Sequence, residues 1–187
     1  MIFITAYFFY AVSILFILGC ATRRLLEKIC SPQSFASPPN LVNILIIGMI
    51  SLTTFISFVS IVSPITLYVH ILVIISLSAY ISLDRKYVSQ TVRFFLSEIK
   101  NNPYLFALGC MCIFPVVIMA TAPVGYFDTG LYHAQAVKWI NEHGTVPGLG
   151  NLHHRLAFNS AWFYFSALFD ILAVDGKTAR LVNIIPS

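Results

Sequence analysis

Long uncharged runs constrain the fold of this chain more than any other feature. Four of them contain no Asp, Glu, Lys or Arg. They are Ile2–Cys20, Leu41–Val62, Ile65–Leu83 and Tyr104–Ala122. A helix needs about 20 mainly apolar residues to cross a bilayer, so each run is long enough to span. Phe158–Val174 is a weaker fifth run, because it contains Asn159 and Asp170. The pattern predicts an all-α, multi-pass transmembrane bundle of about five spans.

The composition excludes a soluble globular domain. Only 10% of the 187 residues are charged, and the mean hydropathy is +0.85. A soluble domain carries roughly 25% charged residues. The net charge of +4 lies in the loops, so it indicates membrane topology and not a nucleic-acid partner. The four cysteines have no spacing typical of a disulfide framework or a metal site.

The distribution of Lys and Arg predicts the orientation. Segments 21–40 and 84–102 carry three and four of these residues, whereas the turn 63–64 carries none. Basic loops stay in the cytoplasm, so we expect the amino terminus outside and the loop 123–157 extracytoplasmic. Within 84–102, apolar residues recur about one turn apart, which predicts an amphipathic helix at the cytoplasmic membrane surface.

Polar side chains gather in one stretch of the external loop, "YFDTGLYHAQAVKWINEHGTVPG". Asp128 is a good N-cap and Gly144 a good residue to follow a helix, so we expect a juxtamembrane helix between them. One face of that helix gathers an acid, a phenol, an amide and an indole. They belong to Asp128, Tyr132, Gln135 and Trp139.

These residue types suit transfer of a group from a lipid-linked phosphate. A carboxylate such as Asp128 can act as general base toward an acceptor hydroxyl. Arg155, with His153 or His154, can hold a phosphate at the membrane surface. The ring of Trp139 can stack on a sugar face.

The order of span, loop Asp, juxtamembrane helix, G-x-V-P and further span resembles the first external loop of GT-C-type glycosyltransferases. The matching residues are Asp128, Tyr132, His133, Gly144 and Pro147. The segment also resembles uncharacterised bacterial multi-pass proteins of that kind. The resemblance covers the region from the fourth run to the fifth. It implies an enzyme of the bacterial inner membrane that builds the cell envelope from polyprenyl-phosphate-linked sugars.

The resemblance also implies roles for individual residues. Asp128 would be catalytic, either as base or by placing a divalent cation, and the metal requirement stays open. Tyr132 and His133 would orient Asp128 or the acceptor. Residues 1–102 would then be an amino-terminal three-span region, and residues 103–187 the start of the core. The resemblance implies that further spans or a partner subunit complete the enzyme.

A non-enzymatic interpretation stays open: a small membrane subunit, a transporter or flippase fragment, or an inactive truncated product. Asp128 would then be only a helix cap, Tyr132 and Trp139 would belong to the interfacial aromatic belt, and residues 153–155 would be a solvated flank. No pair of loop histidines has the spacing of a zinc motif. We expect His70 to make a hydrogen bond between helices.

Overall fold

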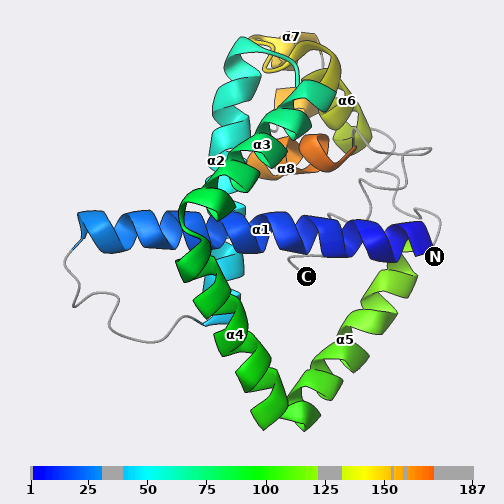
Figure 1. Ribbon diagram of the computed structural model, residues 1–187. Helices are drawn as coiled ribbons and strands as arrows, with labels where there is room; N and C mark the ends of the chain where they lie inside the picture. The colour runs from blue at the N-terminus through cyan, green and yellow to red at the C-terminus, as the bar shows by residue number, and fades with distance from the viewer. Residues whose placement is uncertain (1, 31–39, 122–131, 153, 158–159, 171–187) are drawn as a thin grey trace. The chain divides into compact units, whose positions relative to one another are not determined.

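The computed structural model describes residues 2–30, 40–121, 132–152, 154–157 and 160–170 (Figure 1). Every element within these ranges is a helix, which confirms the predicted all-α class. The helices are α1 (Ile2–Ile29), α2 (Leu41–Val62), α3 (Leu67–Leu83), α4 (Arg85–Asn101), α5 (Pro103–Thr121), α6 (Ala134–His143), α7 (Leu149–Leu152), the single-turn η3 (His154–Ala157) and α8 (Ala161–Asp170).

Two or three of the five predicted spans are supported. The segment Ala6–Ile29 of α1 and the whole of α2 are long and apolar enough to cross a membrane. α3 and α4 add a third crossing if this pair, bent by 92°, is one span. The predicted fourth and fifth spans are not confirmed. The apolar part of α5 is the shorter Phe106–Pro115. Within the fifth predicted span the structure describes the ten residues of α8.

The chain divides into two compact units. Unit 1 comprises Met1–Thr5, Thr53–Leu72 and Val116–Ser187, and unit 2 comprises Ala6–Leu52 and Val73–Pro115. α2 and α3 therefore each contribute one part to each unit. The division at residue 102 that the resemblance implies stays a prediction.

Unit 2 is built on a close contact between α1 and α2. A Cβ atom added at Gly19 would lie 2.0 Å from the carbonyl oxygen of Ile44, and one at Gly48 would lie 2.0 Å from that of Leu15. The two backbones thus meet where neither glycine has a side chain. Apolar membrane helices attract one another mainly by such close packing of small residues. Leu15 and Ile44 are themselves buried beside the contact.

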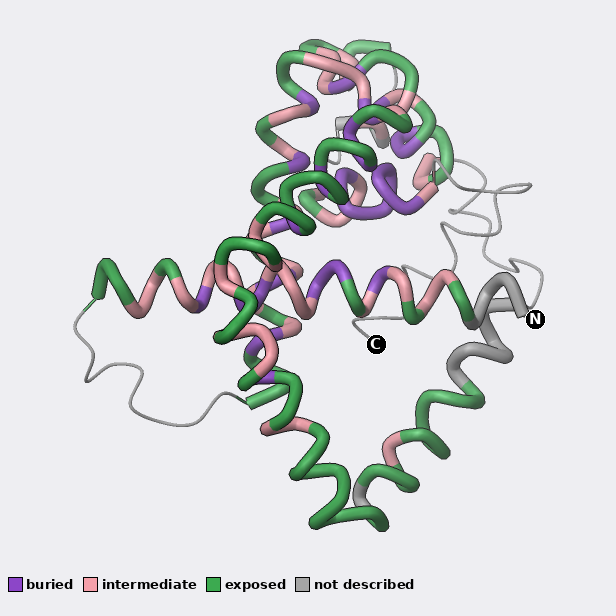
Figure 2. Tube along the Cα trace, in the orientation of Figure 1, coloured by how far each residue is buried: buried purple, intermediate pink, exposed green. Residues whose placement is uncertain are grey.

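Unit 1 is built around α8. Phe165, Leu168 and Phe169 are fully buried, and Figure 2 shows most of this short helix as buried. α6 packs on α8 through its own buried face, which carries Val137 and Ile140. Burying several large side chains on ten residues makes α8 the core of unit 1.

His70 confirms one expectation from the sequence. Its imidazole is buried in unit 1, with Nε2 2.5 Å from the carbonyl oxygen of Leu168. The imidazole ring also lies edge-on to the ring of Phe169. The histidine therefore joins α3 to the core helix α8 by a hydrogen bond.

Candidate functional site

The candidate site begins where α6 ends at Gly144, as the sequence predicts. The backbone N–H of Gly144 donates to the carbonyl oxygen of Ile140 at 3.0 Å, and φ at Gly144 is +73°. A Cβ atom here would lie 2.5 Å from the carbonyl oxygen of Ser60. Only glycine combines this left-handed φ with so close a backbone approach.

A network of neutral hydrogen bonds holds the next residue, Thr145. Its N–H donates to the carbonyl oxygen of Ser60 at 2.7 Å. Its hydroxyl lies 2.8 Å from the hydroxyl of Ser60 and donates to the phenolic oxygen of Tyr164 at 3.2 Å. One threonine thus joins the end of α2, the loop after α6, and α8.

A second set of contacts fixes α6 against the turn between α2 and α3. The N–H of Ile65 donates to the carbonyl oxygen of Ile140 at 3.2 Å. With its amide nitrogen turned toward the neighbouring carbonyls, Asn141 donates to Ala167 at 3.0 Å and to Ile65 at 3.2 Å. The loop after α6 therefore starts from a rigid position.

A cavity of about 330 Å³ lies between this loop and α8. Its walls come from α6, the loop and α7, η3, and the start of α8. The lining residues are Ala136, Trp139, Ile140, Gly144, Thr145, Val146, Pro147, Gly148, Leu149, Gly150, Leu156, Phe163 and Tyr164. Aromatic and aliphatic side chains make most of the wall, and its lining residues carry polar side-chain groups in the hydroxyls of Thr145 and Tyr164 and the indole N–H of Trp139. Apolar walls with a few placed polar groups are typical of small-molecule sites.

The structure brings some predicted site residues to this region. Trp139 lines the cavity, and its ring centroid lies 5.0 Å from that of His143. Tyr132 and His133 contact each other edge-on, with ring centroids 4.2 Å apart. The His133 ring is 5.5 Å from that of Phe163, which also lines the cavity. The start of α6 thus lies beside the start of α8.

Other predicted residues are not placed at the cavity. Asp128 and His153 lie outside the described residues, so their predicted roles stay predictions. His154 is exposed in η3. The backbone of Arg155 also belongs to η3, but its side chain is outside the description. Among the residues that are described, no group of three or more His, Cys, Asp or Glu could hold a metal ion.

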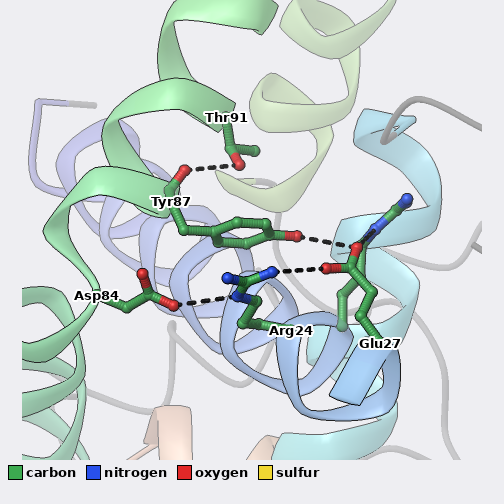
Figure 3. Close-up of polar contacts among 6 residues, drawn as sticks. Arg24, Glu27, Asp84, Tyr87 and Thr91 are labelled. Carbon is green, nitrogen blue, oxygen red and sulfur yellow. Dashed lines mark hydrogen bonds and ion pairs between the residues drawn. The ribbon is translucent and has the colours of Figure 1, made fainter. Parts of the chain in front are cut away.

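Unit 2 contains a cluster of charged residues that we did not predict (Figure 3). Nε of Arg23 lies 3.0 Å from a carboxylate oxygen of Glu27. The guanidinium of Arg24 contacts Glu27 at 3.4 Å and Asp84 at 3.3 Å. It also lies over the ring of Tyr87, whose hydroxyl donates to Glu27 at 3.4 Å. The cluster fastens the end of α1 to the start of α4.

The burial of Arg23 and the balance of charges indicate that this cluster stabilises the fold. Arg23 is only 6% exposed, and two arginines face two carboxylates, so the charges balance. Burial, helped by the carboxylate of Glu27, raises the pKa of Tyr87 to about 12, so its phenol stays a donor near neutral pH. The spacing of Glu27 after Arg23 and Arg24, by four and three residues, was a readable signal of pairing.

Comparison with known proteins identifies the family. The chain belongs to the family described as "Domain of unknown function (DUF8201)", whose model matches residues 1–185. No curated protein and no solved structure matches the chain.

Proposed function

We propose that this chain contributes the donor-binding loop of a membrane glycosyltransferase, which takes a sugar from a polyprenyl-phosphate-linked donor on the extracytoplasmic side. The observation that supports this proposal best is the cavity beside Thr145. It is built from the same G-x-V-P segment and juxtamembrane helix that carry the resemblance to GT-C-type enzymes, and Trp139 is part of its wall.

The walls of the cavity suit a sugar attached to an isoprenoid. A volume of about 330 Å³ is at the lower end of the range for small-molecule sites, roughly 300 to 1,000 Å³. The indole of Trp139 offers a flat apolar face for a pyranose ring. The hydroxyl groups of Thr145 and Tyr164 can bond the hydroxyl groups of a sugar, and Val146, Leu149 and Leu156 can contact the first isoprene unit.

The chemistry assigned to the loop is a single displacement. The acceptor hydroxyl attacks the anomeric carbon, the bond from that carbon to the phosphate oxygen breaks, and polyprenyl phosphate leaves with the electron pair. In this proposal Asp128 takes the proton of the acceptor, oriented by Tyr132 and His133. Arg155, with His153 or His154, stabilises the charge on the leaving phosphate.

The experiment compares two acids of the same loop. Membranes that contain the full-length protein are incubated with radiolabelled polyprenyl-phosphate mannose or aminoarabinose, and the loss of label from the donor is measured. Asp128→Asn should lower transfer at least 10²-fold without changing membrane insertion. The control is Glu142→Gln, because Glu142 is an exposed acid on α6 whose carboxylate lies 3.9 Å from Nζ of Lys138 and 3.8 Å from Nε2 of His143. It should keep full activity.

Equal transfer by Asp128→Asn and wild type would contradict the catalytic role of Asp128. No transfer by the wild type from either donor would instead favour a non-catalytic membrane subunit. Tyr164→Phe keeps the ring and removes one cavity hydroxyl. It should raise the KM for the donor several-fold if the cavity holds the sugar.

A further inference from the structure

The amphipathic helix α4 carries a surface that the proposed function does not use. Its sequence holds four basic residues and one acid, Glu98. Thr91 is the one buried residue of Arg85–Asn101, so most of the surface of this helix is open. An open surface on a basic, amphipathic helix can bind a partner that has both apolar and anionic groups.

One strip of that surface is apolar. Val92, Leu96 and Ile99 follow one another at helical spacing, and their exposed fractions are 38%, 59% and 36%. Residues spaced by four and three positions lie on the same side of a helix. Three large aliphatic side chains therefore form one exposed strip along α4.

A second strip beside it is basic. Lys86, Arg93 and Lys100 are exposed and recur every seven residues, so they too form a line along the helix. Within the described part of the chain, none of the three makes an ion pair with a carboxylate. They differ in this from Arg23 and Arg24, whose charges Glu27 and Asp84 balance.

The other side of α4 fastens the helix to unit 2. Thr91 on this side is buried. Asp84 pairs with Arg24 of α1 at 3.3 Å, and the hydroxyl of Tyr87 donates to Glu27 of α1 at 3.4 Å. The ring of Phe95 lies 5.7 Å from that of Phe16 on α1. These contacts hold α4 with its apolar and basic strips turned away from the α1 side of unit 2.

The position of α4 in the chain indicates what binds to its exposed surface. α4 follows the apolar helix α3 directly and turns from it by 92° at Asp84. A helix that turns by about a right angle at the end of an apolar helix can follow the plane of a membrane surface. An apolar strip flanked by basic residues is typical of helices in that plane.

We propose that α4 binds the surface of an anionic phospholipid bilayer. Val92, Leu96 and Ile99 enter the boundary between headgroups and acyl chains. Lys86, Arg93 and Lys100 contact the lipid phosphates. Each such charge strengthens binding to an anionic surface about fivefold, so three charges give about 10²-fold selectivity over a zwitterionic lipid.

The test measures which lipid stays bound. The purified full-length protein in detergent is exposed to equal amounts of phosphatidylglycerol and phosphatidylcholine, and the bound lipids are counted by native mass spectrometry. The wild type should retain phosphatidylglycerol preferentially. The Lys86→Gln, Arg93→Gln, Lys100→Gln variant should lose this preference at least tenfold. Lys138→Gln, which removes one exposed charge from α6, should leave the preference unchanged.

Two results would overturn the proposal. One is an equal retention of both lipids by the wild type, which needs no variant and so holds even if the triple substitution disturbs folding. The other is displacement of the phosphatidylglycerol by a soluble poly-glutamate peptide at equal charge, which would show that α4 binds acidic protein segments. The Arg93→Lys variant should keep the preference for phosphatidylglycerol. That result would confirm that the positive charge, and not the shape of the arginine side chain, selects the lipid.

Discussion

The two units bury polar groups in different ways. In unit 2 the polar contacts that join α1 to α4 are charged: Arg23 is buried, and the partly exposed Arg24, Glu27 and Asp84 complete its ion-pair cluster. In unit 1 a neutral network does this, in which the hydroxyls of Ser60, Thr145 and Tyr164 connect elements that are far apart in the sequence. Buried ion pairs depend on both partners, whereas neutral hydrogen bonds contribute less and can be replaced more easily.

This difference bears on where each unit can carry chemistry. The charges of the Arg23, Arg24, Glu27 and Asp84 cluster are already balanced within the protein, so the cluster fastens α1 to α4. The neutral network of unit 1 positions the loop and leaves a cavity with no buried charge on its lining residues. A sugar that enters such a cavity meets hydroxyl and aromatic groups and no competing ion pair.

Removing one partner of the charged cluster should have the largest effect. Glu27→Gln leaves the buried Arg23 without its carboxylate, so we expect unit 2 to lose about 3 kcal/mol of stability. Hydrogen exchange of α1 and α4 peptides, measured by mass spectrometry in detergent, reports this loss. Arg23→Met in the Glu27→Gln background should restore part of it. Unchanged protection in Glu27→Gln would mean that the pairs contribute little.

A side chain at Gly144 should have the next largest effect, on unit 1. Gly144→Ala adds a Cβ atom 2.5 Å from the Ser60 carbonyl oxygen at φ +73°, so we expect a loss of about 2 kcal/mol. Exchange in α6 and α8 should rise, while α1 stays protected. The control is Gly148→Ala, where φ is +81° but the nearest atom, on Asn151, is 3.4 Å away. Equal effects of the two substitutions would show that backbone conformation alone matters here.

Removing a neutral partner should have the smallest effect. Thr145→Val deletes the hydroxyl that contacts Ser60 and Tyr164 but keeps the backbone hydrogen bond to Ser60. The Ser60 hydroxyl still donates to the carbonyl oxygen of Ser57 at 2.7 Å, so we expect a loss of only about 1 kcal/mol. Thr145→Ser should be nearly neutral. A loss as large as that of Glu27→Gln would remove the contrast between the units.

Local patterns predicted the all-α class and the end of α6 correctly. Gly144 ends α6 as a residue with positive φ should, and His70 makes the expected contact inside the protein. Counting apolar residues was less reliable at α8. The weaker run Phe158–Val174 does not mark where its helix begins, because α8 begins at Ala161, where the hydroxyl of Ser160 accepts from the N–H of Trp162 at 3.3 Å. Ser160 is a typical N-cap residue, and a count of apolar residues does not take N-caps into account.

The tertiary parts of both polar regions could not be read from the sequence. Arg24 and Asp84 are 60 residues apart, and no local spacing indicates that they pair. The cavity likewise depends on how α6, η3 and α8 fold together. Trp139 was predicted as a site residue and Pro147 was part of the G-x-V-P match. Thr145 and Tyr164 were not predicted, because a lone hydroxyl in a loop or an apolar helix carries no pattern.

The contact at Gly19 and Gly48 has a consequence for the synthesis of the protein. Both glycines belong to the first two helices, so this helix pair can assemble in the membrane before α4 has been translated. Arg23 already has Glu27 on the same helix, and its charge is matched at that stage. Asp84 arrives later and adds its carboxylate to Arg24. The order of translation therefore lets the amino-terminal hairpin serve as the template on which the rest of unit 2 is assembled.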